Sequence, residues 1–229
     1  LKEMKEFVPK SGNTYFTLRH GESKKNVIDI VTDKPDAPYP LTEKGKEETK
    51  EVAKAIKGKV DLIISSPVLR ARETAELLRD ELGFGEDQLI IDECIRESEH
   101  GEFEGLSLEE YFASYPSDIT RFENAPEGGE NWTQIKNRMT EFLFGLEGKY
   151  KDKKILIVSH GDPLALLHAG AKGLNRKETV SGWDQIYPEK GVLRELDFTS
   201  YPHNDNYELD FHRPYIDDLT LEAVSYTHL

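Results

Sequence analysis

Three short stretches of the chain carry residue types that could bind an oxyanion and attack it covalently. The first is the tripeptide Arg19-His20-Gly21, which follows an apolar run typical of a buried strand. Arg19 has a planar, permanently charged guanidinium group that suits a phosphate, and the imidazole of His20 can serve as nucleophile, base or metal ligand. Gly21 lets the backbone turn sharply and approach a ligand. Because a tripeptide such as Arg-His-Gly recurs by chance, the prediction of an oxyanion site depends on the two other stretches.

Matching groups follow the next two strongly apolar runs. Arg70 lies one helical turn after Ser65-Ser66-Pro67, and His160 lies within Ser159-His160-Gly161. In a parallel sheet, all three strand ends lie at the same carboxyl edge, where α/β proteins bind their ligands. Helix N-termini at that edge add free amide donors and positive dipole ends. The sequence therefore predicts that two arginines and two histidines converge on one pocket that fits a phosphoryl group.

A phosphoryl-transfer site also needs a proton donor for the leaving oxygen. The connection between residues 92 and 105 offers four candidates, Glu97, Glu99, Glu102 and Glu104. A carboxyl group half withdrawn from water beside a phosphate has a raised pKa and can act as a general acid. The residues alone do not select one of the four.

Strand-like apolar runs alternate along the chain with helical patterns. The predicted strands cover residues 15–19, 60–64, 89–91, 155–158 and 192–196. One helix begins at Thr42 as N-cap, a second begins at Ser66-Pro67 and ends at Gly83, and three more cover residues 108–115, 132–150 and 162–172. Residues 26–40 are predicted to form a loop. This alternation predicts an α/β fold, a three-layer α/β/α sandwich with a mostly parallel central sheet.

The composition limits the partners of this chain. A net charge of -14 over 229 residues disfavours direct nucleic-acid binding and anionic membranes, and makes a local cluster of cations stand out. No apolar run approaches the roughly 20 residues that span a bilayer, and no signal peptide is recognisable. Cys94 is the only cysteine, so no intrachain disulfide is possible and a cytoplasmic location is expected. Its side chain is predicted to be a small buried hydrophobe. Because the chain begins at Leu1, we expect it to be an excerpt of something longer.

Four blocks together resemble the histidine phosphatase superfamily, the phosphoglycerate-mutase-like group. They occur in the family's order between residues 13 and 197, which we interpret as one domain. The blocks are Arg19-His20-Gly21-Glu22 with Asn26, Ser66-Pro67-x-x-Arg70-Ala71-x-x-Thr74-Ala75, Ile95-Arg96-Glu97 followed by Gly101-x-x-Glu104-Gly105, and Ser159-His160-Gly161.

The resemblance implies a mechanism and a role for each residue. His20 would attack phosphorus and form a phosphohistidine, while Glu97, in the family's acid position, would protonate the leaving group and later help water to attack. Arg19, Arg70, Asn26 and His160 would hold the phosphoryl oxygens, with Gly21 and Gly161 in the substrate-binding backbone. The resemblance implies a small phosphorylated substrate and neither a metal nor another cofactor.

The family contains both mutases and phosphatases, and the sequence favours a phosphatase. The loop at 27–36 is acidic and lacks the Gly-Trp pair associated with mutases. Glu97 is followed by Ser98-Glu99, where mutases tend to carry Arg and Tyr. A phosphoglycerate mutase is the alternative enzyme.

The C-terminal stretch differs in character from the rest of the chain. Residues 198–229 are acidic, rich in Tyr and Asn, and without clear periodicity, so we interpret them as an extension. Within them, residues 208–217 resemble a short segment of isoleucyl-tRNA synthetase, although its ATP-binding signatures are absent. We therefore expect attachment to a larger synthetase polypeptide. A non-enzymatic alternative is a phosphate-binding regulatory module of such a synthetase.

Simpler readings exist for individual residues. A single strand-end histidine is usually satisfied by backbone hydrogen bonds, and Arg70 could pair with Glu73 or Thr74 on its helix. Asn26 could be a turn residue. His100 is predicted to be a loop residue and His168 a packing residue rather than participants in chemistry.

Overall fold

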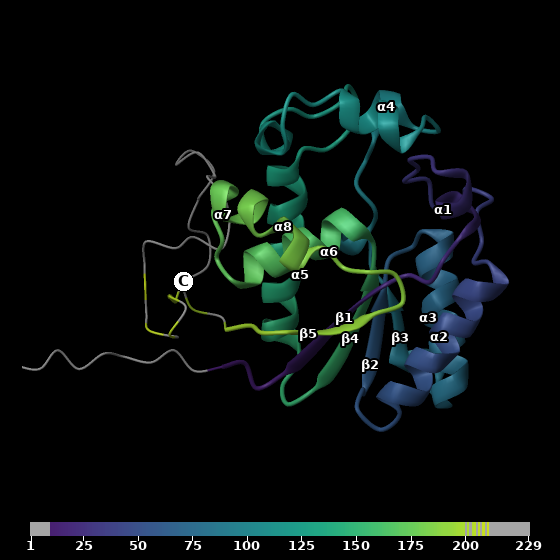
Figure 1. Ribbon diagram of the computed structural model, residues 1–229. Helices are drawn as coiled ribbons and strands as arrows, with labels where there is room; N and C mark the ends of the chain where they lie inside the picture. The colour runs from purple at the N-terminus through teal and green to yellow at the C-terminus, as the bar shows by residue number, and fades with distance from the viewer. Residues whose placement is uncertain are drawn as a thin grey trace, which may run out of the picture.

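A five-stranded sheet forms the centre of the described part of the chain (Figure 1). The computed structural model describes residues 10–199 and residues 201, 203, 204, 206, 208 and 210. The strand order is β3-β2-β4-β1-β5. The strands are β1 (Thr14–Arg19), β2 (Leu62–Ser65), β3 (Leu89–Ile91), β4 (Lys154–Ser159) and β5 (Leu193–Leu196). All neighbours pair in parallel except β5, which runs antiparallel to β1, so the predicted mostly parallel sheet is confirmed.

The register of the central strands brings the three predicted strand ends together. Arg19 at the end of β1 lies opposite Ser159 at the end of β4, and Ser65 at the end of β2 lies opposite Val158. β4 lies between β1 and β2, so the segments that follow all three strands leave the same carboxyl edge. A strand order of this kind places the ligand site of an α/β protein at that edge.

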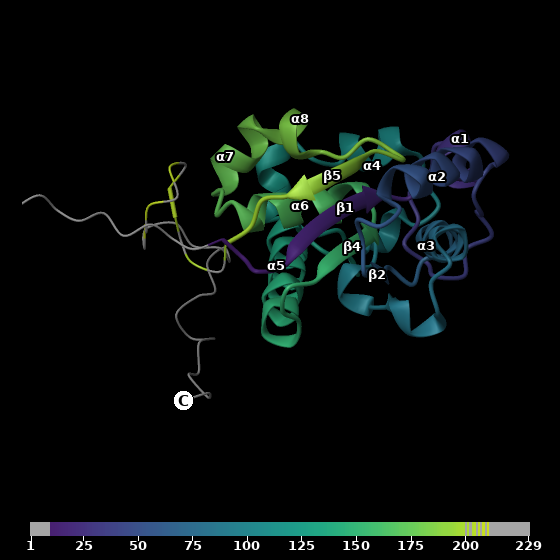
Figure 2. The same ribbon diagram turned by 90° about the horizontal axis from the view of Figure 1, so that it is seen from below.

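Helices cover both faces of the sheet, which gives the predicted three layers (Figures 1 and 2). On one face, α2 (Glu43–Ile56) and α3 (Leu69–Leu82) pack on Ile63 and on Leu156 and Val158. On the other face, α5 (Trp132–Lys149) and α6 (Gly161–Ala171) pack on the alternate strand residues. Successive residues of a strand face opposite sides, so a strand covered on both sides is a continuous apolar run.

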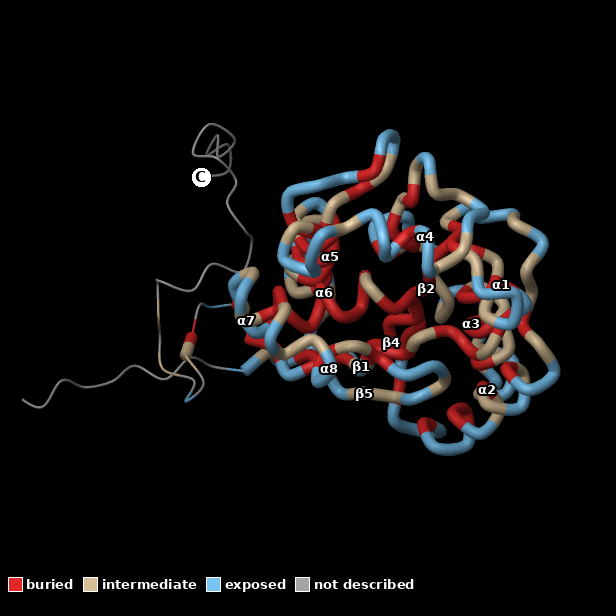
Figure 3. The backbone as a smooth tube through the Cα atoms, turned by 45° about the horizontal axis from the view of Figure 1, so that its top comes forward, coloured by how far each residue is buried: buried red, intermediate tan, exposed pale blue. Residues whose placement is uncertain are grey.

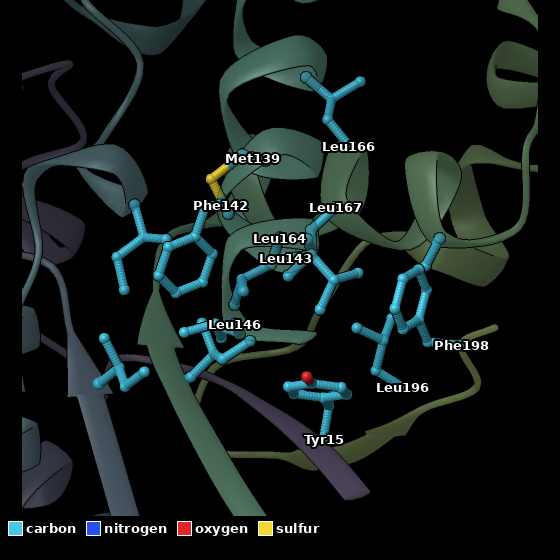
Figure 4. Packing of buried hydrophobic residues seen from close by; sticks show 14 of the residues in the cluster. Tyr15, Met139, Phe142, Leu143, Leu146, Leu164, Leu166, Leu167, Leu196 and Phe198 are labelled. Carbon is cyan, nitrogen blue, oxygen red and sulfur yellow. The ribbon is translucent and has the colours of Figure 1, made fainter. Parts of the chain in front are cut away.

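The larger core lies between the sheet and the α5–α6 pair. Figure 4 shows side chains of α5 and α6 meeting Tyr15 of β1 and Leu196 of β5. Phe198, one residue beyond the predicted domain boundary, is buried in the same core and contacts the Tyr15 ring edge-on, with ring centroids 6.0 Å apart. Figure 3 shows long buried runs in β4 and α6, in which only Lys154 and Asp162 are not buried.

Helix ends follow their local sequence signals, with some differences. Thr42 is the N-cap of α2 and accepts a hydrogen bond from the Gly45 amide at 3.1 Å, as predicted, and Gly83 ends α3 in the left-handed conformation. The helix after Ser66-Pro67 begins later than predicted, at Leu69.

Three short helices were not predicted: α1 (Lys24–Ile28), α7 (Arg176–Ser181) and α8 (Trp183–Ile186). α1 lies at the start of the predicted 26–40 loop, and it is too short to show a helical period. The remaining helical elements are α4 (Leu108–Ala113) and 3₁₀ turns at Glu86–Gln88, Glu93–Ile95, Gly101–Phe103 and Asp118–Phe122. Within the described ranges, no helix combines the length and apolar character needed to cross a bilayer. Apart from Glu208 and Asp210, the synthetase-like segment at 208–217 lies outside the described residues.

Two glycines let the segment after β1 cross the start of α2 at close range. A Cβ atom on Gly21 would lie 2.5 Å from the Gly45 carbonyl oxygen. A Cβ atom on Gly45 would lie 2.7 Å from the amide nitrogen of Glu22 and closer still to its carbonyl oxygen. Neither glycine has a positive φ, so the need for glycine comes from this backbone contact and not from a left-handed turn.

We expect Gly45→Ala to lower the free energy of unfolding by about 1–3 kcal/mol, the usual cost of overpacking a buried site. Gly145→Ala on α5 is the matched control, because a Cβ there meets nothing within 4 Å. It should be neutral or stabilising by up to about 1 kcal/mol, since alanine favours helix interiors. Urea denaturation measures both. Equal effects of the two substitutions would show that the crossing is not close-packed.

Candidate functional site

A cavity of about 100 Å³ opens at the carboxyl ends of β1 and β4, between the sheet edge and the α1 and α4 segments. Its walls combine charged and aromatic side chains from five separate parts of the chain. They are Arg19, Lys25, Asn26, Val31, Glu97, His100, Leu108, Tyr111, Phe112, Gly161, Asp162 and Tyr187. His20, Arg70 and His160 lie buried directly behind this lining and contact Glu97 or one another.

Both ring nitrogens of His20 form hydrogen bonds, one with a backbone carbonyl oxygen and the other with an arginine. Its Nδ1 lies 2.8 Å from the Gly21 carbonyl oxygen, which can only accept, so Nδ1 carries the proton. Its Nε2 accepts a hydrogen bond from Arg70 Nε at 3.0 Å. Burial lowers the pKa of His20 well below 6.5, and the charge of Arg70 lowers it further. The ring is therefore neutral, and its Nε2 lone pair accepts the hydrogen bond from Arg70.

Arg70 is the buried centre of the site. Only 1% of the residue is exposed, and besides His20 it donates from Nη2 to the Glu97 carboxylate at 2.9 Å and to the Thr32 carbonyl oxygen at 3.2 Å. Its guanidinium contacts neither Glu73, which accepts from the Leu41 amide, nor the Thr74 side chain. The simpler reading of Arg70 as a helix-surface residue is therefore excluded.

The structure separates the four candidate glutamates. Only Glu97 reaches the cavity, where its carboxylate also accepts from the Ser98 amide at 3.0 Å. Glu99 pairs with Arg96, and Glu102 accepts from the Glu127 amide. Glu104 accepts hydrogen bonds from the Thr32 hydroxyl and the Asp33 amide.

The ionisation state of Glu97 differs from the sequence expectation of a raised pKa. Burial raises the pKa of this carboxyl, but the adjacent Arg70 guanidinium, His100, Lys25 and the Ser98 amide together outweigh burial, and the pKa falls from 4.5 to about 2. The expectation considered the bound phosphate and not the arginine that faces Glu97 when no phosphate is present. Glu97 is a carboxylate in the free site.

His160 faces the same centre from the end of β4. Its Nε2 lies 2.7 Å from the Ser66 hydroxyl, and its ring centroid is 5.2 Å from that of His20. Its buried Nδ1 has no hydrogen-bond partner and lies 3.4 Å from the Glu97 carboxylate. Burial, followed by the charge of Arg70, lowers the pKa of His160 well below 6.5.

Arg19 and Asn26 each keep donors available to the cavity. Arg19 donates to the Pro188 carbonyl oxygen at 3.3 Å and lies over the Tyr187 ring, while its Nε has no partner. Asn26 Oδ1 accepts from the Ser23 amide at 3.0 Å, which caps α1. Asn26 thus lies within α1 and not in a turn, and it also lines the cavity, so its predicted contact with a phosphoryl oxygen stays a prediction.

The two glycines of the predicted set are placed differently. Gly161 lines the cavity at the start of α6, and a Cβ there would collide with the Tyr187 hydroxyl. Gly21 does not line the cavity; its carbonyl holds His20, and its amide donates to the Thr74 hydroxyl at 3.2 Å.

Several residues around the cavity were not predicted. Lys25 of α1 is buried, and His100 lines the cavity although the sequence suggested an ordinary loop residue. Asp162 accepts from Arg121 Nη2 at 2.5 Å and from the Trp132 indole at 3.1 Å. In the sequence, Lys25 lies between Glu22 and Asn26 of the first block. That position was the one signal that it could lie near the site. His168, 6% exposed and 2.9 Å from the Thr17 hydroxyl, is a packing residue as predicted.

Arg138 of α5 fixes the backbone of the segment that carries Glu97. It donates to the carbonyl oxygens of Cys94 at 2.8 Å, Arg96 at 3.2 Å and Glu97 at 3.3 Å. Its own position is fixed by a two-pronged pair with Glu130, at 2.8 and 2.9 Å. The Glu97 carboxylate is therefore held from its side chain by Arg70 and from its backbone by Arg138.

The arrangement suits an anion and not a cation. Among the described residues, no group of three or more His, Cys, Asp or Glu side chains is placed to hold a metal ion. The Glu97 and Asp162 carboxylates are each paired with an arginine, whereas Arg19 is in no ion pair of the described residues. A neutral imidazole nitrogen, guanidinium donors and a nearby carboxyl group are the parts needed for covalent transfer of an oxyanion.

Comparison with known proteins places these parts in a family. Residues 15–187 match the family model of the histidine phosphatase superfamily (branch 1). A 2,3-bisphosphoglycerate-dependent phosphoglycerate mutase of Parvibaculum lavamentivorans is 27% identical over 74% of this chain and 84% of its own length. The uncharacterized phosphatase PhoE of Bacillus subtilis is 31% identical over 66% and 72%, respectively. Phosphoserine phosphatase 1 of Hydrogenobacter thermophilus is 27% identical over 69% and 75%.

Solved structures agree with this placement. YhfR of Bacillus stearothermophilus has a TM-score of 0.66 and 28% identity, covering 80% of this chain and 90% of its own. A mycobacterial glucosyl-3-phosphoglycerate phosphatase solved with VO3 has a TM-score of 0.66 and 25% identity, covering 80% and 91%. The relatives include both mutases and phosphatases, so they do not by themselves select one reaction.

We expect the Arg70–Glu97 pair to appear in the pH dependence of stability. A pKa lowered from 4.5 to about 2 adds stability that is full above pH 4.5 and is lost as pH falls toward 2. The amount is about 3 kcal/mol. Glu97→Gln should therefore be less stable than the wild type at pH 7, with the gap narrowing between pH 4.5 and 2.

Urea denaturation across this pH range measures the gap. Glu99→Gln is the control, because it removes a half-exposed carboxyl from the same segment, and exposed pairs contribute only about 1 kcal/mol or less. Parallel stability curves for the wild type and Glu97→Gln would contradict a strong pairing of Glu97 with Arg70.

Proposed function

Because this chain belongs to the histidine phosphatase superfamily, we propose that it is a metal-independent phosphomonoester hydrolase that works through a phosphohistidine intermediate on His20. One observation carries the proposal. His20 is buried and neutral, its Nδ1 is held by the Gly21 carbonyl, and its Nε2 lone pair faces the Arg70 guanidinium. A phosphoryl group that replaces this contact with Arg70 would meet the nucleophile directly.

The first chemical step transfers the phosphoryl group to His20. Nε2 attacks phosphorus, the N–P bond forms, and the bond between phosphorus and the leaving oxygen breaks. Arg19 and Arg70, with Asn26 and His160, hold the oxygens that carry the negative charge of the transition state. Binding groups that are preorganised and shielded from water stabilise this charge more than water does.

Glu97 supplies the proton to the leaving oxygen. In the free site it is ionised because Arg70 faces it. A bound phosphoryl dianion offsets the charge of Arg70 and places negative charge beside the carboxylate, and both effects raise the pKa of Glu97. Substrate binding thus lets Glu97 take up a proton from solvent, and the protonated carboxyl then gives it to the leaving oxygen. In the second step the carboxylate takes a proton from water, which attacks phosphorus and releases phosphate from His20.

The surroundings of Glu97 support a phosphatase over a mutase. Apart from Lys25, the cations near it are already paired, Arg96 and Arg138 with Glu130 and Arg121 with Asp162. A mutase must also retain a bisphosphate, whose second phosphate needs more unpaired cations than Lys25 alone. Isomerisation of 3-phosphoglycerate tests the mutase alternative.

Attachment to a synthetase polypeptide rests on residues 208–217 of the sequence alone and is tested by reading the full-length gene.

We expect His20→Asn to abolish hydrolysis of p-nitrophenyl phosphate and the acid-labile phosphoenzyme trapped by rapid quenching. His168→Asn is the matched control, a buried histidine outside the cavity, and it should still become phosphorylated. Wild-type activity should persist in EDTA. Turnover by His20→Asn, or wild-type turnover without a phosphoenzyme, would contradict the proposed intermediate.

We expect Glu97→Gln to slow hydrolysis of alkyl phosphates more than that of aryl phosphates, by about 10- to 100-fold more in kcat/KM. A phenolate leaves without needing a proton, whereas an alkoxide requires one, and general acid catalysis contributes about 10²- to 10⁴-fold. Steady-state kinetics with phenyl and ethyl phosphate measure the difference. Equal losses on both substrates would leave Glu97 without the acid role.

A further inference from the structure

Lys25 of α1 is a buried cation at the cavity that the proposed mechanism does not use. Only 6% of the residue is exposed, and it lines the cavity together with Glu97 and His100. Its neighbour Lys24 is exposed to solvent. A lysine is rarely buried unless it has a partner, because removing its charge from water is costly.

Lys25 forms no ion pair in the described ranges of the chain, although carboxylates lie near it. Arg70 is paired with Glu97 at 2.9 Å and Arg121 with Asp162 at 2.5 Å. Burial lowers the pKa of Lys25 to about 8, against the opposing charge of Glu97, so Lys25 is still mostly protonated at neutral pH. An anion that enters the cavity would meet a desolvated ammonium group whose nearby carboxylates are each bound to an arginine.

Lys25 shares the lined part of the cavity with Glu97. Lys25, Glu97 and His100 line the cavity, whereas His20, Arg70 and His160 lie buried behind this lining. Since Glu97 protonates the leaving oxygen in the proposed mechanism, a group that extends from that oxygen into the cavity would meet Lys25. We call this lined part of the cavity the leaving-group side.

The other walls at this side are apolar and compact. They come from the Val31 segment and from α4, whose residues Leu108, Tyr111 and Phe112 line the cavity. Arg121 lies 5.6 Å from the Tyr111 ring centroid and is bound to Asp162, so it is not available to a ligand. His100 is neutral, because burial lowers its pKa. The leaving-group side therefore offers one point charge in a small apolar enclosure.

We propose that Lys25 binds a carboxylate carried by the leaving group, so that the substrates of this chain are small phosphomonoesters with a carboxylate close to the ester oxygen. The inference rests on the proposed function in one respect, that the phosphoryl group occupies the His20 side. A carboxylate fits better than a second phosphate, because a single ammonium group matches one negative charge. Arg19 and Arg70 are both occupied by the first phosphoryl group.

The test measures binding to the inactive His20→Ala chain, so that it does not depend on turnover. The probes are 2-phosphoglycolate and ethyl phosphate, which have nearly the same size and differ by a carboxylate in place of a methyl group. Calorimetry at pH 7 should show about 10- to 100-fold tighter binding of 2-phosphoglycolate, the range of one hydrogen bond between charged groups.

Adding Lys25→Met should bring the ratio of the two affinities close to one, because methionine keeps the length of the side chain and removes its charge. Lys25→Arg should keep a preference for 2-phosphoglycolate. Lys24→Met, on the exposed neighbour, should leave the ratio as it is. Thermal unfolding of each variant checks that it is folded, and Lys25→Arg carries the test if the methionine variant is not.

Two results would overturn the inference. One is equal affinity of the His20→Ala chain for both probes. The other is an equal loss of affinity for both on Lys25→Met, which would place Lys25 on the phosphoryl group itself. Failure of the proposed function is a separate result, the absence of a phosphoenzyme in the wild-type chain. If no phosphoenzyme forms, the ratio of the affinities for 2-phosphoglycolate and ethyl phosphate still tests whether Lys25 binds a carboxylate.

Discussion

The buried guanidinium group of Arg70 is the interaction on which the site depends. It joins the nucleophile candidate His20, the carboxylate of Glu97 and the Thr32 carbonyl, and it is almost wholly removed from water. A charge in that position must be compensated, and Glu97 supplies the compensation. Burial keeps both histidines neutral and the charge of Arg70 adds to that effect, while Arg70 is the strongest of the groups that keep Glu97 ionised. One guanidinium thus contributes to the protonation state of all three groups in the free site.

The fold and the positions of the main site residues were predictable because they depend on strong local patterns. β2 and β4 are continuous apolar runs, and register alone brings their carboxyl ends beside that of β1. Thr42 was predictable as an N-cap because the cap is formed within three residues. α1 and α8 were missed because helices of four or five residues are too short for a periodic signal, and α7 was missed although it is as long as the predicted α4.

What could not be predicted depends on contacts between distant parts of the chain. The pKa of Glu97 was expected to be raised, and it is lowered because Arg70, from another helix, lies beside it. Cys94 was expected to be buried, yet its side chain is exposed while its backbone carbonyl is bound by Arg138. Lys25 was not singled out, because nothing in a run of two lysines shows which one faces the interior. Residues 211–229, and with them most of the synthetase-like segment, lie outside what the structure describes.

The hold of Arg138 on the Glu97 segment has a consequence for how such a chain can diverge. The guanidinium binds carbonyl oxygens at positions 94, 96 and 97, and carbonyl oxygens are common to every amino acid. The side chain at position 94 can therefore be exchanged without displacing the carboxylate, which is a form of mutational robustness. Substitutions can then accumulate at such positions of this segment while the Glu97 carboxylate stays in place. The side chains of this segment could therefore change during evolution without loss of the position of Glu97.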